Sequence, residues 1–231
     1  MEYGISDSNA FPVLKVRLEK GERFISEPGA MVYMKGVRLI SSLKGGVFSV
    51  LKRKFFGKED IFWNVLECVD EKGEFCLSPF YLGGIAEVGI FNNEIYAKPG
   101  SFLGAFVEYE TFKLEGEVSN LPTFFAFKDI SFLKLKGNGM VFLSGLGGID
   151  EIVLDDDEIV VDTGHVLAYE GSLDMKIRSV GPVRSFLFSR EGFVCLFRGS
   201  GKIWIHNRND AEFIAYVDRM LAEFKGASVK K

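Results

Sequence analysis

The sequence contains an internal repeat. Residues 82–90 read LGGIAEVGI and residues 146–154 read LGGIDEIVL, so the leucines that begin the two copies, Leu82 and Leu146, lie 64 residues apart. The match continues downstream at the equivalent pairs Glu94 and Glu158, and Gly100 and Gly164. Repetition at a fixed period indicates that each unit buries its apolar face against its neighbours. The chain is therefore expected to fold as a series of similar units.

Two weaker signals extend the repeat. A faint third copy places Leu18, Glu22 and Gly29 at equivalent positions, with one extra residue before the glycine that a β-bulge accommodates. Residues 136–143 (KGNGMVFL) and 198–205 (RGSGKIWI) form a second related pair, in which Gly-x-Gly precedes β-branched and aromatic residues. Both motifs predict turns that lead into strands.

The units themselves have the pattern of short strands. Runs such as residues 158–162 (EIVVD) are rich in Val, Ile and Phe and are bounded by Gly, Pro, Asn or Asp. The 26 glycines supply the positive φ angles of tight turns, and the 23 phenylalanines fill a core between sheets. We expect an all-β fold, a β-sandwich, as a single domain over residues 1–208.

The last part of the chain has a different period. Apolar residues follow one helical stripe, Asn209 or Asp210 is placed to cap a helix, and Gly226 is placed to end it. We expect one C-terminal helix over residues 209–225, packed on the β domain, and a frayed tail over residues 226–231. The stripe consists of Phe213, Ile214, Val217, Leu221 and Phe224.

Charge and composition exclude some classes of protein. The formal charge of −4 and the isoelectric point near 5.4 argue against a chain that coats nucleic acid. The first 20 residues have no continuous apolar segment of a secretory signal, and no stretch reaches the roughly 20 apolar residues of a transmembrane helix. A cytoplasmic location is expected. The absence of glutamine, with abundant Lys and Glu, is typical of thermophile proteins.

The three cysteines give no metal-binding pattern. Cys68, Cys76 and Cys195 include no CxxC pair, so neither a zinc site nor a disulfide framework is predicted. Cys68 and Cys76 flank the turn signal of residues 70–73 (DEKG) and could face each other across a hairpin. Buried free thiols are the favoured interpretation, because cysteine is among the most buried residue types; a disulfide between these two stays open.

Three segments resemble a known family. They are residues 21–32 (GERFISEPGAMV), 161–168 (VDTGHVLA) and 199–205 (GSGKIWI). The chain from about Leu14 to Arg208 resembles the altered-inheritance-of-mitochondria protein twenty-four family. This resemblance implies the fold of the trp RNA-binding attenuation protein (TRAP-like), a β-sandwich or double-stranded β-helix built from internal repeats, and a homotrimer. It implies no activity, because the prokaryotic branch of the family has none established.

The histidines do not form the pattern of a metal centre. A cupin-type site in a double-stranded β-helix needs about three imidazoles and a carboxylate, whereas this chain has only His165 and His206, on different predicted elements. No metal or cofactor is therefore predicted. His165 could act as a base oriented by Asp162, but a turn histidine bonded to backbone is favoured because no nucleophile lies beside it. His206 is expected to pack with Trp204 on one strand face.

Two further motifs have structural explanations. Residues 145–148 (GLGG) and 199–202 (GSGK) resemble phosphate-binding loops, but both lead into strands rather than helices, so hairpin turns are predicted. The acidic run of residues 155–158 (DDDE) offers oxygen ligands for calcium or magnesium, but it lacks EF-hand spacing. A solvated hairpin tip is the favoured interpretation, since Asp is common in turns.

The segment from residue 44 to residue 58 differs most from its surroundings, because basic residues alternate there with apolar ones. Such a segment could hold an anionic membrane surface or stack on the bases of RNA. It could equally pack in a hairpin or an oligomer interface with its lysines pointing outward, which is slightly favoured. The candidate interaction surface consists of Lys44, Lys52, Arg53, Lys54, Phe55, Phe56 and Lys58.

These observations favour a non-enzymatic, oligomeric β scaffold or binding module whose main partner is a copy of itself. The first alternative is a protein that binds RNA or an anionic membrane through residues 44–58. The second is a small-ligand pocket protein or cupin-like enzyme with a pocket between its sheets.

Overall fold

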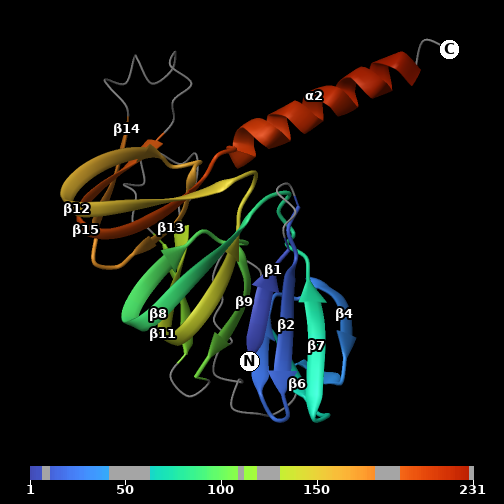
Figure 1. The fold of residues 1–231 in the computed structure, drawn as a ribbon. Coiled ribbons are helices and arrows are strands. Elements are labelled where there is room, and N and C mark those ends of the chain that lie inside the picture. The colour runs from blue at the N-terminus through green and yellow to red at the C-terminus, as the bar shows by residue number, and fades with distance from the viewer. Residues whose placement is uncertain (7–10, 42–62, 109–111, 119–130, 180–192, 229–231) are drawn as a thin grey trace.

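The computed structural model describes residues 1–6, 11–41, 63–108, 112–118, 131–179 and 193–228. These described residues form two antiparallel sheets and one C-terminal helix (Figure 1). The predicted all-β fold with a single C-terminal helix is confirmed.

The smaller sheet has four strands, and the larger sheet has eleven. The smaller sheet has the order β1 (Glu2–Ile5), β2 (Leu14–Glu19), β7 (Lys72–Leu77) and β4 (Met31–Lys35). The larger sheet has the order β12 (Ile149–Asp162), β15 (Phe193–His206), β13 (Val166–Glu170), β8 (Ile85–Ala97), β11 (Ser131–Ser144), β9 (Phe102–Val107), β3 (Arg23–Ser26), β6 (Asn64–Cys68) and β5 (Val37–Ser41). Off this path, β10 (Lys113–Val118) pairs with β11 and β14 (Asp174–Ser179) pairs with β15.

A phenylalanine-rich core joins the two sheets. Phe75 on β7 packs with Phe24 on β3 at a ring distance of 5.2 Å, and Phe24 packs with Phe142 on β11 at 6.0 Å. All three side chains are fully buried, together with Leu14 and Leu18 of β2. The expectation that phenylalanine fills the space between sheets is therefore confirmed.

Four strands of the larger sheet are long and contain irregularities at their centres. β8, β11, β12 and β15 are 13 or 14 residues long. The β12–β15 register shifts between Leu154 and Asp157, where Asp156 has a φ of 53° and faces the Gly199–Gly201 segment. The β8–β11 pair has the same irregularity beside Asn92, whose φ is 59°. A β-bulge admits such a residue without ending the ladder.

Two predicted hairpins are therefore wrong. Residues 199–202 and residues 155–158 lie inside β15 and β12, which pair with each other on both sides of the bulge. The reason is that glycine with positive φ and clustered Asp serve a bulge and a turn equally well. The glycine-rich residues 145–148 do lie in a connection, but the strands that they join, β11 and β12, do not pair with each other in the described sheet, so a hairpin is wrong here as well.

The two copies of the repeat meet at their glycines. Gly83 and Gly147 are equivalent in the repeat and form a parallel β-bridge, and the Gly84 amide donates to the Gly147 carbonyl at 2.7 Å. A Cβ atom on Gly83 would lie 2.3 Å from backbone atoms of Gly145 and Gly147. This close approach explains why both copies have glycine there.

The helix α2 (Asp210–Ser228) leaves the β body and projects from it (Figure 1). Its start agrees with the prediction, since the Asn209 side-chain oxygen accepts a hydrogen bond from the Ala211 amide at 2.9 Å. It extends three residues past the predicted end at 225, and residues 229–231 lie outside the described part of the chain. The predicted packing on the β domain is wrong for residues 211–224, of which all but the half-buried Val217 are exposed. An amphipathic period shows that a helix has an apolar face to bury, but it does not show which element or chain packs against that face.

Candidate interaction edge

One edge of the molecule is formed by two strands that follow each other in the chain. Among the described strands, β4 is the last of the smaller sheet and β5 is the last of the larger sheet, and only Gly36 separates them. Gly36 has a φ of 66°, and a Cβ atom there would lie 2.7 Å from the Lys72 carbonyl oxygen, so glycine is required at this bend. Residues 31–41, here called the β4–β5 edge, thus border both sheets.

The β4–β5 edge presents apolar side chains to solvent. Successive residues of a strand point to opposite faces, yet every described side chain of β4 is exposed. An edge strand offers unpaired backbone groups for association, and proteins usually protect such edges with charges or with a covering segment. The large apolar residues here, each at least 36 % exposed, are Met31, Val32, Tyr33, Met34, Leu39 and Ile40.

The charges on this edge are basic. They are Lys35 and Arg38, and the Arg38 guanidinium binds the Glu67 carboxylate at 2.5 Å. Arg38 and Arg23 together lower the pKa of Glu67 from its ordinary value through hydrogen bonds. The edge is therefore apolar along most of its length and cationic at its centre.

The strand at the other end of the larger sheet has the opposite character. β12 carries seven acidic residues, of which Glu158 pairs with Arg198, and Glu151 pairs with Lys202 at 2.8 Å. Its exposed apolar residues are Val153 and Val160. The two ends of the sheet are thus complementary in charge, one basic and one acidic.

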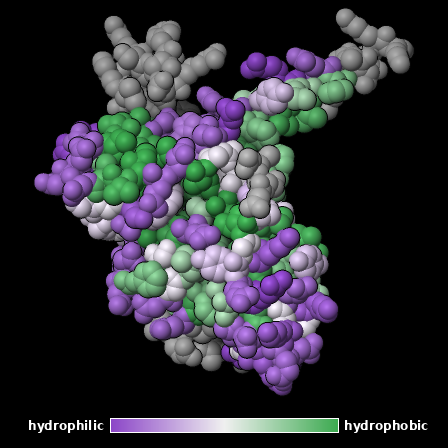
Figure 2. Space-filling model, in the orientation of Figure 1, coloured by the Kyte–Doolittle hydropathy of each residue, from purple (hydrophilic) through white to green (hydrophobic). Residues whose placement is uncertain are grey.

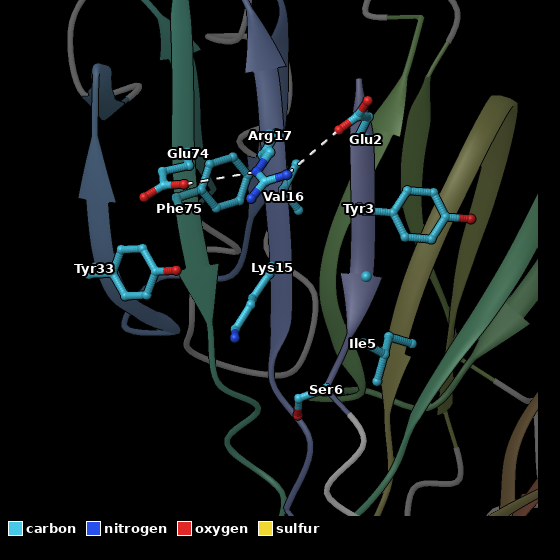
Figure 3. Close-up of a pocket in the computed structure, with 11 residues that line it drawn as sticks. Glu2, Tyr3, Ile5, Ser6, Lys15, Val16, Arg17, Tyr33, Glu74 and Phe75 are labelled. Carbon is cyan, nitrogen blue, oxygen red and sulfur yellow. Dashed lines mark ion pairs between the residues drawn. The ribbon is translucent and has the colours of Figure 1, made fainter.

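A shallow cavity lies on the outer face of the smaller sheet, beside β4. It has a volume of about 370 Å³, and Figure 3 shows Tyr33 of β4 and Lys15 of β2 on its floor. Arg17 lies 3.9 Å from the carboxylates of both Glu2 and Glu74. A neighbouring cavity of about 360 Å³ includes Lys35. Both cavities lie on this outer face, whereas the sequence interpretation placed a ligand pocket between the sheets.

The two histidines lie close together but bind backbone groups. The His165 Nδ1 atom is 2.7 Å from the His206 carbonyl oxygen, which confirms the predicted turn histidine bonded to backbone. His206 is 1 % exposed, and its Nδ1 atom accepts a hydrogen bond from the Leu146 amide at 3.1 Å. Burial lowers the pKa of His206 to about 4. The sequence did not indicate these polar contacts, because residues 146, 165 and 206 are far apart in the chain; the expected packing of His206 with Trp204 stays a prediction, and both side chains are buried on β15.

A group of polar side chains surrounds the first turn of α2. The Asp210 carboxylate binds the Lys98 ammonium at 2.6 Å and accepts a hydrogen bond from the Tyr81 hydroxyl at 3.4 Å. Burial raises the pKa of Tyr81 to about 12 and that of Glu27 to about 7. No local motif could reveal this group, because its members come from four separate parts of the chain. Among the described residues, no set of three or more His, Cys, Asp or Glu side chains could hold a metal ion.

The remaining predicted residues have mixed outcomes. Lys44, Lys52, Arg53, Lys54, Phe55, Phe56 and Lys58 all lie outside the described residues. Cys68, Cys76 and Cys195 are free and buried, so the favoured interpretation as buried thiols is confirmed. Burial raises the pKa of all three thiols, that of Cys195 to about 12.

Comparison with known proteins gives the family. A family model described as "Mitochondrial biogenesis AIM24" matches residues 3–208. The chain belongs to the AIM24 family. The resemblance seen in the sequence motifs is thereby confirmed. This AIM24 protein is 25% identical over 229 residues to an uncharacterized protein of Streptococcus pyogenes serotype M6, covering 96% of this chain and 91% of that one.

A solved structure shares the fold of this AIM24 protein. It is the crystal structure of a Streptococcus pyogenes protein determined by structural genomics, with a TM-score of 0.76 and 23% sequence identity. The match covers 95% of this chain and 99% of that chain. In the described part of the chain, no helix has the length and apolar character needed to cross a membrane.

Proposed function

We propose that this AIM24 protein is a non-enzymatic β scaffold that assembles with copies of itself through the β4–β5 edge, as the homotrimer implied by the family resemblance. The observation that carries the proposal is the position of this edge, which ends both sheets and exposes apolar side chains on both faces of β4. Association pairs the open backbone groups and removes apolar area from water, at roughly 25 cal/mol per Å².

The acidic β12 strand supports a head-to-tail arrangement. The basic β4–β5 edge of one copy would face the acidic β12 edge of the next, so that opposite charges meet at each contact. A contact between two different surfaces of the same chain closes into a ring when the rotation between copies allows it. A trimer is the smallest such ring beyond a dimer.

The two cavities are open to solvent. The ion pairs of Arg17 in the larger cavity are exposed, so they add little to stability or to binding. Binding of RNA or an anionic membrane by residues 44–58 stays a prediction.

The test is light scattering after gel filtration at micromolar protein concentration. We expect the wild-type chain at three times its 25.8 kDa mass. Val32→Glu adds a charge to the β4–β5 edge and should shift the protein to monomer, because a buried unpaired carboxylate is costly. The matched control is Leu82→Glu, since Leu82 and Val32 are both 56 % exposed and only Val32 lies on this edge.

The outcomes separate clearly. A wild-type monomer would overturn the scaffold proposal. An unchanged oligomer in Val32→Glu would show that copies meet elsewhere, which would overturn the assignment of this edge. Dissociation of the Leu82→Glu control together with Val32→Glu would show a general loss of structure and would count against the edge as well.

A further inference from the structure

In the described part of the chain, polar contacts fix helix α2 at its first turn. Asp210 is fixed by Lys98 and Tyr81, and the Asn209 side-chain amide donates to the Asp162 carboxylate at 3.3 Å. Beyond this first turn, the large apolar side chains of the helix are 39 to 69 % exposed, apart from the half-buried Val217. They are Phe213, Ile214, Tyr216, Met220, Leu221 and Phe224. Figure 2 shows this apolar surface along one side of the helix and polar surface along the other.

The spacing of these residues is that of a helix–helix seam. Phe213, Val217, Met220 and Phe224 follow one another at intervals of four, three and four residues. This is the a/d alternation of a coiled coil, in which each side chain inserts between residues of a facing helix. Ile214 and Leu221 lie beside the seam and widen it. A seam of this kind is complementary to another copy of itself.

We propose that the apolar face of α2 packs against the α2 helices of the other copies in the assembly. This inference rests on the proposed self-association and assigns it a second contact, separate from the β4–β5 edge. An amphipathic helix of 19 residues is marginal in water without a packing partner, so the helix gains stability when its face is covered.

The width of the face favours more than one neighbouring helix. A two-helix coiled coil buries the a and d positions only, whereas a face that also includes e positions is wide enough for a helix surrounded by several others. In a trimer each α2 would meet two others, which matches this width. The copies would then contact one another through strands in the β body and through the α2 helices at one end of the assembly.

The charges of the polar face argue against a membrane as the occupant. Glu212, Asp218 and Glu223 outnumber Arg219 over residues 211–224. Helices that lie on anionic membranes have basic polar faces, because the lipid surface is negative. A second copy of the helix has no such conflict, since Glu212 and Asp218 lie away from the shared seam and Glu223 lies at its border.

The test uses cysteine cross-linking in the full chain. Met220→Cys places a thiol in the seam, and Ala222→Cys, two residues later, places one on the opposite side of the helix. The native thiols are buried, and burial raises their pKa, so they do not compete. Under a mild added oxidant, two thiols from neighbouring copies lose two electrons and two protons to form one disulfide. We expect covalent dimers for Met220→Cys and at most a tenth of that yield for Ala222→Cys.

A second measurement tests the helix contact in case the geometry of the two cysteines does not allow a disulfide to form. Hydrogen exchange over residues 211–224 should be slow in the wild-type assembly, at least tenfold faster in Leu221→Glu, and unchanged in Ala222→Glu. Fast exchange in an intact wild-type trimer, or equal cross-linking of the two cysteine variants, would overturn the α2 contact and leave the scaffold proposal standing. A wild-type monomer would overturn both.

Discussion

His206 and Glu27 are titratable side chains whose burial acts in opposite directions on stability. The pKa of His206 falls to about 4, so the unfolded chain binds this proton more readily, and stability is lost as the pH drops from 6.5 towards 4. The pKa of Glu27 rises to about 7, because a carboxylate oxygen is buried without a hydrogen-bond partner among the described residues. Its contribution is lost as the pH rises from 4.5 towards 7. The two effects offset each other between pH 4.5 and 6.5.

Substitution of either residue should reveal the effect of the other. In Glu27→Gln the free energy of unfolding should fall by about 2–3 kcal/mol, relative to wild type, as the pH drops from 6.5 to 4.5, because the His206 effect is no longer offset. In His206→Asn the relative stability should rise over the same range. Urea unfolding at pH 4.5, 5.5 and 6.5 measures both. Parallel pH profiles for all three proteins would contradict the assignment.

Individual residues also show where sequence reasoning was sufficient. The backbone-bonded His165 and the buried thiols were predicted correctly, because turn position and residue type determine them locally. Glu27, Tyr81 and Lys98 gave no signal, since their shared environment arises only when distant strands meet at the start of α2. Burial of a polar side chain at such a junction is a property of the fold and has no motif.

At the scale of elements, α2 shows which properties of a helix are determined by the local sequence. Its start was predicted from the cap and the apolar period, but its surroundings were not, because the same period suits a helix covered by its own domain or by another chain. The long strands show the same limit. The bulges in these strands have the amino-acid composition of turns. Only the strand pairing that continues on both sides of a bulge distinguishes it from a turn.

The attachment of α2 depends on the pair formed by Lys98 and Asp210. In Lys98→Met, the Asp210 carboxylate loses its cation, so the first turn of α2 should open more often. We expect roughly tenfold faster hydrogen exchange over residues 211–216, corresponding to about 1.4 kcal/mol for this local contact. Lys136→Met is the control, because Lys136 pairs with Glu94 in the strands at 3.2 Å and has no contact with the helix. Equal exchange in both variants would show that other contacts hold the helix.

At the scale of the whole molecule, the contact between Gly83 and Gly147 joins the two copies of the repeat. Gly83→Ala forces a methyl group against backbone on three sides, and we expect it to lower the free energy of unfolding by about 2–3 kcal/mol. Gly4→Ala, with no atom within 4 Å of the added group, should change stability by less than about 0.5 kcal/mol. Urea midpoints of the two variants provide the comparison. An unchanged urea midpoint for Gly83→Ala would mean that the two copies of the repeat separate at this contact without loss of stability.

The repeat, the all-β class and the family were accessible from the sequence, because they depend on patterns shared by many residues. The β4–β5 edge was not, since an edge is defined by the strand that is missing beside it. Residues 31–41 have an ordinary strand composition, and only the order of strands in both sheets shows that they lie at a border.

Asn92 and Asp156, the left-handed residues at the centres of β8 and β12, occupy equivalent positions in the two copies. Each copy therefore bends its long strand at the same place, so the bend belongs to the repeated unit rather than to either strand alone. Asparagine and aspartate, the side chains found there, are among the few that tolerate this left-handed geometry.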